Sequence, residues 1–218
     1  MIYIVGVGPG DPELITIKAK KVIEDSEVVA GWESVLNRFN EMFKNKKIIK
    51  LTYNNQIEEL EKIMKIAKDG KVVSILNHGD PTVSDWQFLE KIKKLANEHN
   101  VKVEVVSGVS SINIVLAREG LDLAHCALVS LHVRGEVNLL EIKKLLEIGR
   151  IVIVIPKPNP KGPQELAKDL IRLGLSNKKV IVYEKVTYND ERRREYVLYS
   201  LATEEIEFSN LTIMVIFP

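Results

Sequence analysis

The chain has almost no cysteine: Cys126 is the only one among its 218 residues. A single thiol cannot form an internal disulfide or build a cysteine-rich metal site. This usage is typical of a reducing compartment, so we expect the protein to be cytoplasmic. The four histidines are not spaced as metal ligands, and the sequence therefore predicts no metal site.

An excess charge of one sign and long apolar runs are also missing. The 31 basic residues nearly balance 30 acidic ones, which leaves a formal net charge of +1. No overall field therefore attracts nucleic acid or an anionic membrane. No apolar stretch reaches the ~18 residues that a membrane-spanning helix needs. We expect no nucleic-acid and no membrane partner, and any anionic ligand must be bound by local charges.

What the sequence does contain is a run of alternating glycines directly after an apolar N-terminal segment. Residues 2–12 read Ile-Tyr-Ile-Val-Gly-Val-Gly-Pro-Gly-Asp-Pro. Glycine allows a ligand to approach the main chain closely. A dinucleotide-binding loop would have a third glycine where Asp11 stands, and Pro9 and Pro12 would disturb the helix that must follow. The loop therefore suits a small ligand without phosphate better than NAD.

Short apolar runs alternate with helical periodicity, which is typical of mostly parallel sheets covered by helices. In the first half we predict strands at 2–7, 28–30, 48–51, 72–76 and 103–106, and helices at 16–25, 57–68 and 86–97. In the second half we predict helices at 112–119, 139–146 and 164–173, and strands at 128–133, 151–155 and 180–184. The tail predicts two strands, 194–200 and 211–217, without a long helix, which indicates an antiparallel, mixed-sheet ending. We therefore expect two α/β domains, 1–110 and 111–218.

Three loops rich in glycine, hydroxyl and carboxylate groups each follow a predicted strand. They span residues 6–12, 77–81 (Asn-His-Gly-Asp-Pro) and 107–111 (Ser-Gly-Val-Ser-Ser). If the strands are parallel, the loops meet at the carboxyl edge of one sheet, where open α/β sheets bind ligands. These groups suit an amino-acid-like zwitterion, a ribose diol and an adenine edge. No Gly-Lys-Ser/Thr sequence is present, which argues against a triphosphate.

With these motifs the chain resembles the tetrapyrrole methylase family. The family pattern lies in residues 5–12 (Val-Gly-Val-Gly-Pro-Gly-Asp-Pro), 79–81 (Gly-Asp-Pro) and 108–111 (Gly-Val-Ser-Ser), in the same order along the chain. Residues 130–135, Glu184 and Glu191 are most similar to the subgroup that methylates C5 of a corrin precursor. The resemblance implies two α/β domains, each with a mixed, mostly parallel sheet flanked by helices, with a cofactor cleft between them. It also implies a homodimer.

The resemblance further implies an enzyme: an S-adenosyl-L-methionine-dependent C-methyltransferase on a corrin precursor in cobalamin biosynthesis, which releases S-adenosyl-L-homocysteine. The accepting ring carbon is already nucleophilic, so we expect no dedicated catalytic side chain. Alignment of the reactants supplies the rate, because positioning lowers such barriers by about 7–11 kcal/mol.

Two sets of site residues follow from the family positions. The cofactor contacts implied are Gly8, Pro9, His78, Gly79, Asp80, Val83, Ser110 and Ser111, with Ile155, Pro156 and Val186 in the second domain. The substrate is an anionic tetrapyrrole with several carboxylates, which guanidinium and ammonium groups suit. For it we expect His132, Arg134, Lys157 and Arg192, with Lys161 and Arg193 as further candidates.

Three alternatives stay open. The chain could methylate another precorrin carbon or be a diphthine synthase of the same family. It could be an NAD-binding oxidoreductase, in which Glu24, Asp25 or Glu27 would bind the ribose, although Asp11 argues against that class. It could also bind S-adenosylmethionine without turnover.

Overall fold

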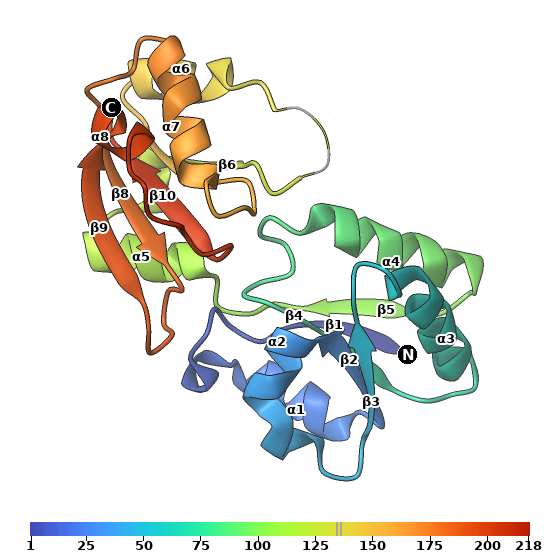
Figure 1. The fold of residues 1–218 in the computed structure, drawn as a ribbon. Coiled ribbons are helices and arrows are strands. Elements are labelled where there is room, and N and C mark those ends of the chain that lie inside the picture. The colour runs from blue at the N-terminus through green and yellow to red at the C-terminus, as the bar shows by residue number, and fades with distance from the viewer. Residues whose placement is uncertain (134, 136) are drawn as a thin grey trace. The chain divides into compact units, whose positions relative to one another are not determined.

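The computed structural model describes residues 1–133, 135 and 137–218. The chain divides into two compact units, Met1–Ser110 and Ser111–Pro218. Figure 1 colours the first unit from blue to green and the second from green to red. Each unit contains one five-stranded sheet. Among the described residues, no helix has the length and apolar composition needed to cross a membrane.

The first unit alternates strands and helices around a fully parallel sheet. The strand order is β3-β2-β4-β1-β5, and all four neighbouring pairs are parallel. The strands are β1 (Ile2–Gly6), β2 (Val28–Trp32), β3 (Lys47–Leu51), β4 (Val73–Asn77) and β5 (Val103–Val106). The helices are η1 (Pro12–Leu14), α1 (Ile17–Asp25), α2 (Glu33–Leu36), η2 (Asn37–Phe43), α3 (Gln56–Lys68) and α4 (Trp86–Glu98).

Both faces of this sheet are covered, because successive strand residues point to opposite sides. Ile2 and Ile4 belong to a core with α3 and α4, which includes Leu60 and Ile92. Val5 belongs to a second core on the other face, with α1, α2 and η2. This two-sided burial explains why the inner strands β1, β2 and β4 read as nearly continuous apolar runs rather than as alternating ones. It also leaves the ends of the strands, not the faces, for a ligand.

Helix α1 begins directly after Thr16, which is its N-cap residue. The Thr16 hydroxyl accepts a hydrogen bond from the Ala19 amide at 3.1 Å, which satisfies one free donor of the first turn. Ala19, Val22 and Ile23 face the core, while the lysines between them are exposed. The helix therefore begins and ends within one residue of the predicted range.

The second unit is built on a mixed sheet with the strand order β6-β7-β10-β8-β9. Its strands are β6 (Cys126–Ser130), β7 (Ile151–Ile155), β8 (Lys179–Glu184), β9 (Arg192–Val197) and β10 (Thr212–Ile216). Its helices are α5 (Ser111–Glu119), η3 (Leu123–His125), α6 (Leu140–Glu147), α7 (Gly162–Arg172) and α8 (Leu198–Ala202). Helices α6, α7 and α8 contribute to the core on one face. On the other face, Glu119 of α5 accepts a hydrogen bond from the Tyr183 hydroxyl.

The prediction of two mixed α/β sheets is confirmed, with one correction in the second unit. Only the β6–β7 pair is parallel there, whereas β10 pairs antiparallel with both β7 and β8, and β8 pairs antiparallel with β9. That sheet is therefore mostly antiparallel. Strands β8 and β9 are joined directly by the loop 185–191, as antiparallel neighbours can be, and β10 then enters between β7 and β8 and runs opposite to both.

Two predicted strands have wrong boundaries. The strand expected at 128–133 is β6, which begins at Cys126 and ends at Ser130, so His132 follows the strand. The strand expected at 194–200 is β9, which covers Arg192–Val197; the next residues form the short helix α8. Arg192, expected on a loop, is therefore the first residue of a strand.

Candidate functional site

The three glycine-bearing loops meet at one edge of the first sheet. They follow β1, β4 and β5, which are parallel neighbours in the order β4-β1-β5. The first two loops also bond directly to each other. The Gly8 amide donates to the Gly79 carbonyl at 3.2 Å, and the Gly79 amide donates to the Gly8 carbonyl at 2.9 Å. The predicted meeting of the loops at a carboxyl edge is present in the structure.

The main chains of Gly6, Gly79 and Gly108 lie in very close contact at this edge. A Cβ atom on Gly6 would lie 2.6 Å from the Gly108 amide nitrogen and 2.7 Å from the Gly79 carbonyl oxygen. A Cβ atom on Gly108 would lie 2.7 Å from the Gly6 carbonyl carbon. All of these neighbours are main-chain atoms, which cannot rotate away as a side chain can. Only glycine therefore fits at either position.

Asp80 joins the second loop to the third. Its Oδ2 atom accepts a hydrogen bond from the Gly108 amide at 3.0 Å, and its Oδ1 atom accepts from the Thr82 amide at 2.7 Å and from the Thr82 hydroxyl at 2.5 Å. The side chain is buried. Bonds to a charged acceptor are the stronger class of hydrogen bond. We interpret Asp80 as the residue that fixes the loops, because its carboxylate is already engaged within the protein.

Sequence reasoning missed Arg38, which lies beside the same loops. It belongs to η2, and its Nη1 atom donates to the Gly10 carbonyl at 3.2 Å. Burial, with a smaller effect of the nearby Arg38 charge, lowers the pKa of His78 to about 4, although a hydrogen bond with the Gly8 main chain opposes both effects. His78 is therefore neutral at pH 7. No sequence motif connects position 38 to the loops, so only the fold reveals this contact.

The neutral His78 makes a pH-dependent contribution to stability. Its pKa is about 4 in the folded chain and about 6.5 in an unfolded one. The unfolded state therefore binds the proton first, and stability falls as the pH drops from about 6.5 to about 4. At pH 5 we expect a loss of about 1–2 kcal/mol relative to pH 7. Urea unfolding should show this loss for the wild type but not for His78→Gln; equal pH profiles would contradict the assignment.

A second titratable group that sequence reasoning missed is Asp85, at the start of α4. Burial raises the pKa of this carboxyl to about 6, against opposing effects of a hydrogen bond with the Asn77 side chain and of the Lys91 charge. Asn77 is the last residue of β4, so Asp85 lies next to the second glycine loop. A carboxyl with a pKa near 6 can exchange a proton at neutral pH.

Asp85→Asn should stabilise the chain at high pH. The folded pKa of Asp85 lies above its unfolded value, so the native carboxyl loses stability as the pH rises from about 4 to about 6. The asparagine keeps an acceptor for Asn77 and has no charge to bury. We expect a gain of about 1–2 kcal/mol at pH 8 and little gain at pH 4. Thermal unfolding at both values measures it, and a pH-independent difference would contradict this account.

The remaining predicted cofactor residues of the first unit surround this edge. Gly8 is buried with a φ of +86°, and Pro9 follows it in the buried part of the loop. The Val83 amide donates to the Asp80 carbonyl at 3.1 Å. Ser110 is a buried polar residue at the end of the third loop. Ser111 is the first residue of α5 and belongs to the second unit.

The predicted residues of the second unit share one edge of its sheet. Strands β6 and β7 are parallel, and β8 points the same way because β10 is antiparallel to both β7 and β8. The carboxyl ends of β6, β7 and β8 therefore lie on one edge, where β9 also begins. The predicted residues that lie at or just beyond these strand ends are His132, Ile155, Pro156, Lys157, Val186 and Arg192. Arg134 lies outside the described residues.

Two further substrate candidates bind within the chain instead. Arg193 pairs with Glu119, with its Nε atom 2.8 Å from Oε1, and with Glu195 at 2.7 Å. Lys161 donates from Nζ to the main-chain carbonyls of Glu205 and Ile206. These contacts indicate structural roles for both residues. Arg192 is exposed and stays a candidate.

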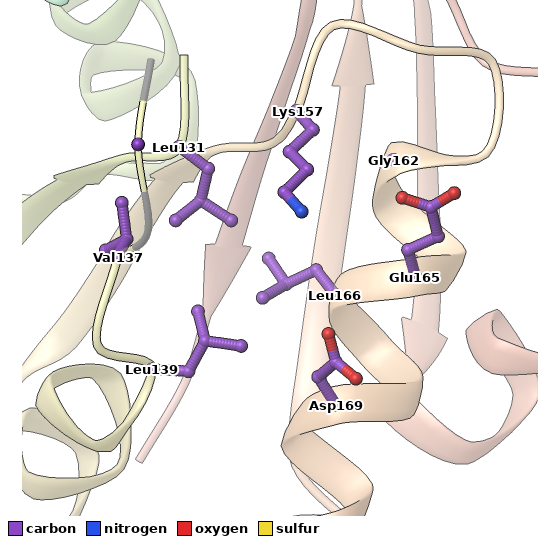
Figure 2. A pocket seen from close by; sticks show the side chains of 9 residues that line it. Leu131, Val137, Leu139, Lys157, Gly162, Glu165, Leu166 and Asp169 are labelled. Carbon is purple, nitrogen blue, oxygen red and sulfur yellow. The ribbon is translucent and has the colours of Figure 1, made fainter. Parts of the chain in front are cut away.

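A pocket of about 260 Å³ in the second unit contains Lys157. Figure 2 shows the Lys157 ammonium pointing between an apolar wall and helix α7, from which Glu165 and Asp169 project. The apolar wall consists of Leu131, Val137 and Leu139, and Leu166 adds an apolar side chain from α7 itself. Among its described lining residues, two carboxylates outnumber one ammonium, so the interior disfavours an anionic group. This lining does not support Lys157 as a ligand for a substrate carboxylate, and that role stays a prediction.

Comparison with known proteins gives a consistent result. The tetrapyrrole (corrin/porphyrin) methylase family matches residues 1–202. A probable cobalt-precorrin-7 C(5)-methyltransferase of Methanocaldococcus jannaschii is 35% identical over 217 residues, which cover 99% of this chain and 97% of that protein. A cobalt-precorrin-4 C(11)-methyltransferase of the same organism is 35% identical over 169 residues, which cover 77% of this chain and 59% of that protein.

Solved structures share the fold. A uroporphyrin-III C-methyl transferase from Thermus thermophilus, complexed with S-adenyl homocysteine, is 28% identical with a TM-score of 0.80, and the match covers 99% of this chain and 96% of that one. A precorrin-6Y methylase from Archaeoglobus fulgidus has a TM-score of 0.73 at 23% identity, with 100% and 97% covered. The predicted resemblance is thus confirmed, and the chain belongs to the tetrapyrrole methylase family.

Proposed function

We propose that this chain is an S-adenosyl-L-methionine-dependent C-methyltransferase that methylates C5 of cobalt-precorrin-7 in cobalamin biosynthesis. The observation that carries the proposal is the meeting of three glycine-bearing loops at one carboxyl edge, in a chain 35% identical over 99% of its length to a probable enzyme of that activity. The position of the methylated carbon rests on that identity and on the subgroup resemblance of residues 130–135, Glu184 and Glu191.

The residues present at the loop edge fit such a cofactor. Gly6 and Gly108 hold main-chain atoms so close that a Cβ atom has no room, so the edge presents backbone rather than side chains. Ser110 adds a buried hydroxyl. Backbone amides and hydroxyls suit an amino-acid moiety and a ribose diol, and this edge has no lysine-bearing phosphate loop. We assign the cofactor contacts to Gly8, Pro9, His78, Gly79, Val83, Ser110 and Ser111, with Asp80 acting through the loops.

The chemistry that the protein must perform is mainly positioning. S-adenosylmethionine supplies, when bound, a methyl group on a positively charged sulfur. The loop edge orients the donor and excludes water, and an alignment of this kind lowers a barrier by about 7–11 kcal/mol. We propose no catalytic side chain. Neutral His78 adds no positive charge next to a cationic donor, which is favourable for binding it.

The second unit contributes the other proposed contacts. Ile155, Pro156 and Val186 would contact the adenosine part, and His132, Arg134, Lys157 and Arg192 would bind substrate carboxylates. Support comes from the placement of the described members of this set at one edge of the second sheet. The expectations of a homodimer, of a cytoplasmic location and of no nucleic-acid or membrane partner stay predictions.

The direct test is methyl transfer from donor carrying a ¹³C-labelled methyl group. The protein is incubated with this donor and cobalt-precorrin-7, and the product is analysed by mass spectrometry and ¹³C NMR. We expect one added methyl group at C5. A label at another ring carbon would favour another precorrin methyltransferase, and binding without transfer would favour a protein that only holds the cofactor. A nicotinamide found by mass spectrometry of the purified protein would contradict the proposal.

A further inference from the structure

The loop between β8 and β9 has an unusual backbone for its sequence. It spans residues 185–191 and joins two antiparallel strands. Lys185 has a φ of +49° and Thr187 a φ of +71°, although neither is glycine. The Tyr188 amide donates to the Lys185 carbonyl at 2.9 Å, which closes a turn with Val186 and Thr187 at its centre. Thr187 therefore occupies the position that normally requires glycine in a type II turn. A β-branched residue there is strained.

The centre of this turn presents the main-chain groups of Val186, which no described residue binds. The Val186 residue is 4% exposed. Within the residues that the structure describes, its amide and carbonyl have no hydrogen-bond partner. Buried main-chain groups are almost always paired, so a free donor and acceptor side by side indicate a missing ligand. The N–H and C=O groups of a single residue can pair with the edge of an aromatic base: the N–H donates to a ring nitrogen, and the C=O accepts from an amino group.

Two charged side chains hold the turn in this conformation. Glu191, at the end of the loop, accepts a hydrogen bond from the Thr187 amide at 2.6 Å through Oε2. Its other oxygen, Oε1, forms an ion pair with Arg118 of α5. The Glu191 side chain is 19% exposed and the Arg118 side chain 39%, so the carboxylate is largely shielded from solvent while the guanidinium stays partly exposed. Strained backbone persists only where its surroundings fix it, and such strain gathers at ligand-binding sites.

We propose that Glu191 and Arg118 are positioning residues for the cofactor: they hold the strained turn so that the Val186 main chain is ready to bind the adenine edge. The inference rests on the proposed function, since it assumes that Val186 faces the cofactor. It adds a role for two residues that the loop edge of the first unit does not involve. Neither side chain touches the reacting atoms, so both affect the affinity for the cofactor and not the transfer step.

Glu191→Gln tests the role with little change of shape. The glutamine side chain has no negative charge, so it loses the ion pair with Arg118 and weakens the hydrogen bond from the Thr187 main chain. We expect the dissociation constant for S-adenosylhomocysteine, measured by calorimetry, to rise about fivefold, equal to about 1 kcal/mol. The KM for S-adenosylmethionine should rise in parallel, whereas kcat at saturating cofactor stays unchanged.

The chain offers a matched control and a rescue. Glu119→Gln removes another ion pair between α5 and β9, to Arg193, without touching the turn. It should leave the dissociation constant within about twofold of the wild type. Thr187→Gly relieves the strain directly, so combined with Glu191→Gln it should restore the affinity to within about twofold of the wild type.

Each outcome decides between explanations. Wild-type affinity in Glu191→Gln overturns the inference. An equal loss in Glu119→Gln also overturns it, because the effect would then reflect general packing of α5. A loss that Thr187→Gly does not rescue overturns the positioning role and indicates direct contact of Glu191 with the ligand. Failure of the wild type to bind S-adenosylhomocysteine contradicts the proposed function itself, and the inference falls with it.

Discussion

Gly108→Ala should abolish binding of S-adenosylhomocysteine while the second unit keeps its fold. The added Cβ atom would meet the Gly6 carbonyl carbon at 2.7 Å, and no rotation of a side chain can relieve a clash between main-chain atoms. The loop after β5 must therefore move away from the loop after β1. We expect the dissociation constant to rise at least about a hundredfold, and the stability to fall by about 1–3 kcal/mol, the usual cost of overpacking. Calorimetry and urea unfolding measure the two effects.

Gly174→Ala is the matched control for that substitution. Gly174 has a φ of +89° and no heavy atom within 4 Å of its added Cβ, so alanine strains the backbone there without a clash. The cost should be about 1–2 kcal/mol of stability. Binding should not change, because this glycine lies far along the sequence from the loops. Tight binding by Gly108→Ala, or equal loss in both variants, would contradict the loop edge as the cofactor site.

Asp80→Asn should weaken the same binding by a smaller factor, about thirtyfold. One carboxylate oxygen becomes an amino group, which then faces either the Gly108 amide or the two donors of Thr82. A donor that faces a donor loses the hydrogen bond and leaves a buried group unsatisfied, at a cost of about 1–3 kcal/mol. The third loop is then no longer fixed to the second. Calorimetry with S-adenosylhomocysteine gives the affinity, and thermal unfolding gives the stability.

Asp122→Asn provides the control for Asp80. Asp122 also accepts a hydrogen bond from the amide two residues later, that of Ala124, but it caps the exposed helix η3 in the second unit. Its substitution should leave the affinity unchanged. Undiminished binding by Asp80→Asn, and by the harsher Asp80→Ala, would show that the second loop is not part of the site.

The first sheet could be predicted from the sequence because its strands are buried on both faces. The central strands Ile2–Gly6 and Val73–Asn77 are almost wholly apolar and buried, and each is followed by a glycine-bearing turn. Parallel order then places the turns at one edge without further information. The loops of the candidate site were predictable for the same reason, since every one of them begins where a strand ends.

The second sheet was harder to predict because its pairing depends on the tail. Nothing local in Thr212–Ile216 reveals that this strand lies between β7 and β8 and runs against both. The run after Ser130 is apolar enough to suggest a longer strand, but β6 ends there. Apolar content alone does not distinguish a paired strand from a buried loop.

Contacts between distant side chains were not predictable. Arg38 reaches Gly10 and influences His78 because η2 lies beside the first loop, and no sequence spacing expresses that. From the sequence, Arg193 was predicted to bind substrate together with its neighbour Arg192. In the structure it binds Glu119, which lies 74 positions away along the chain. Charge in a sequence indicates that a partner exists, and only the fold identifies it.

The measurement that tests the central claim most directly is a ¹H–¹⁵N NMR titration of the whole chain with S-adenosylhomocysteine. The account predicts that the amide signals of Gly8, Gly79 and Gly108 shift together and saturate with one dissociation constant. It also predicts that the signal of Gly174, in the second unit, does not move. Shifts confined to residues outside the three loops, or no shifts at all, would contradict the claim that these loops bind the methyl donor.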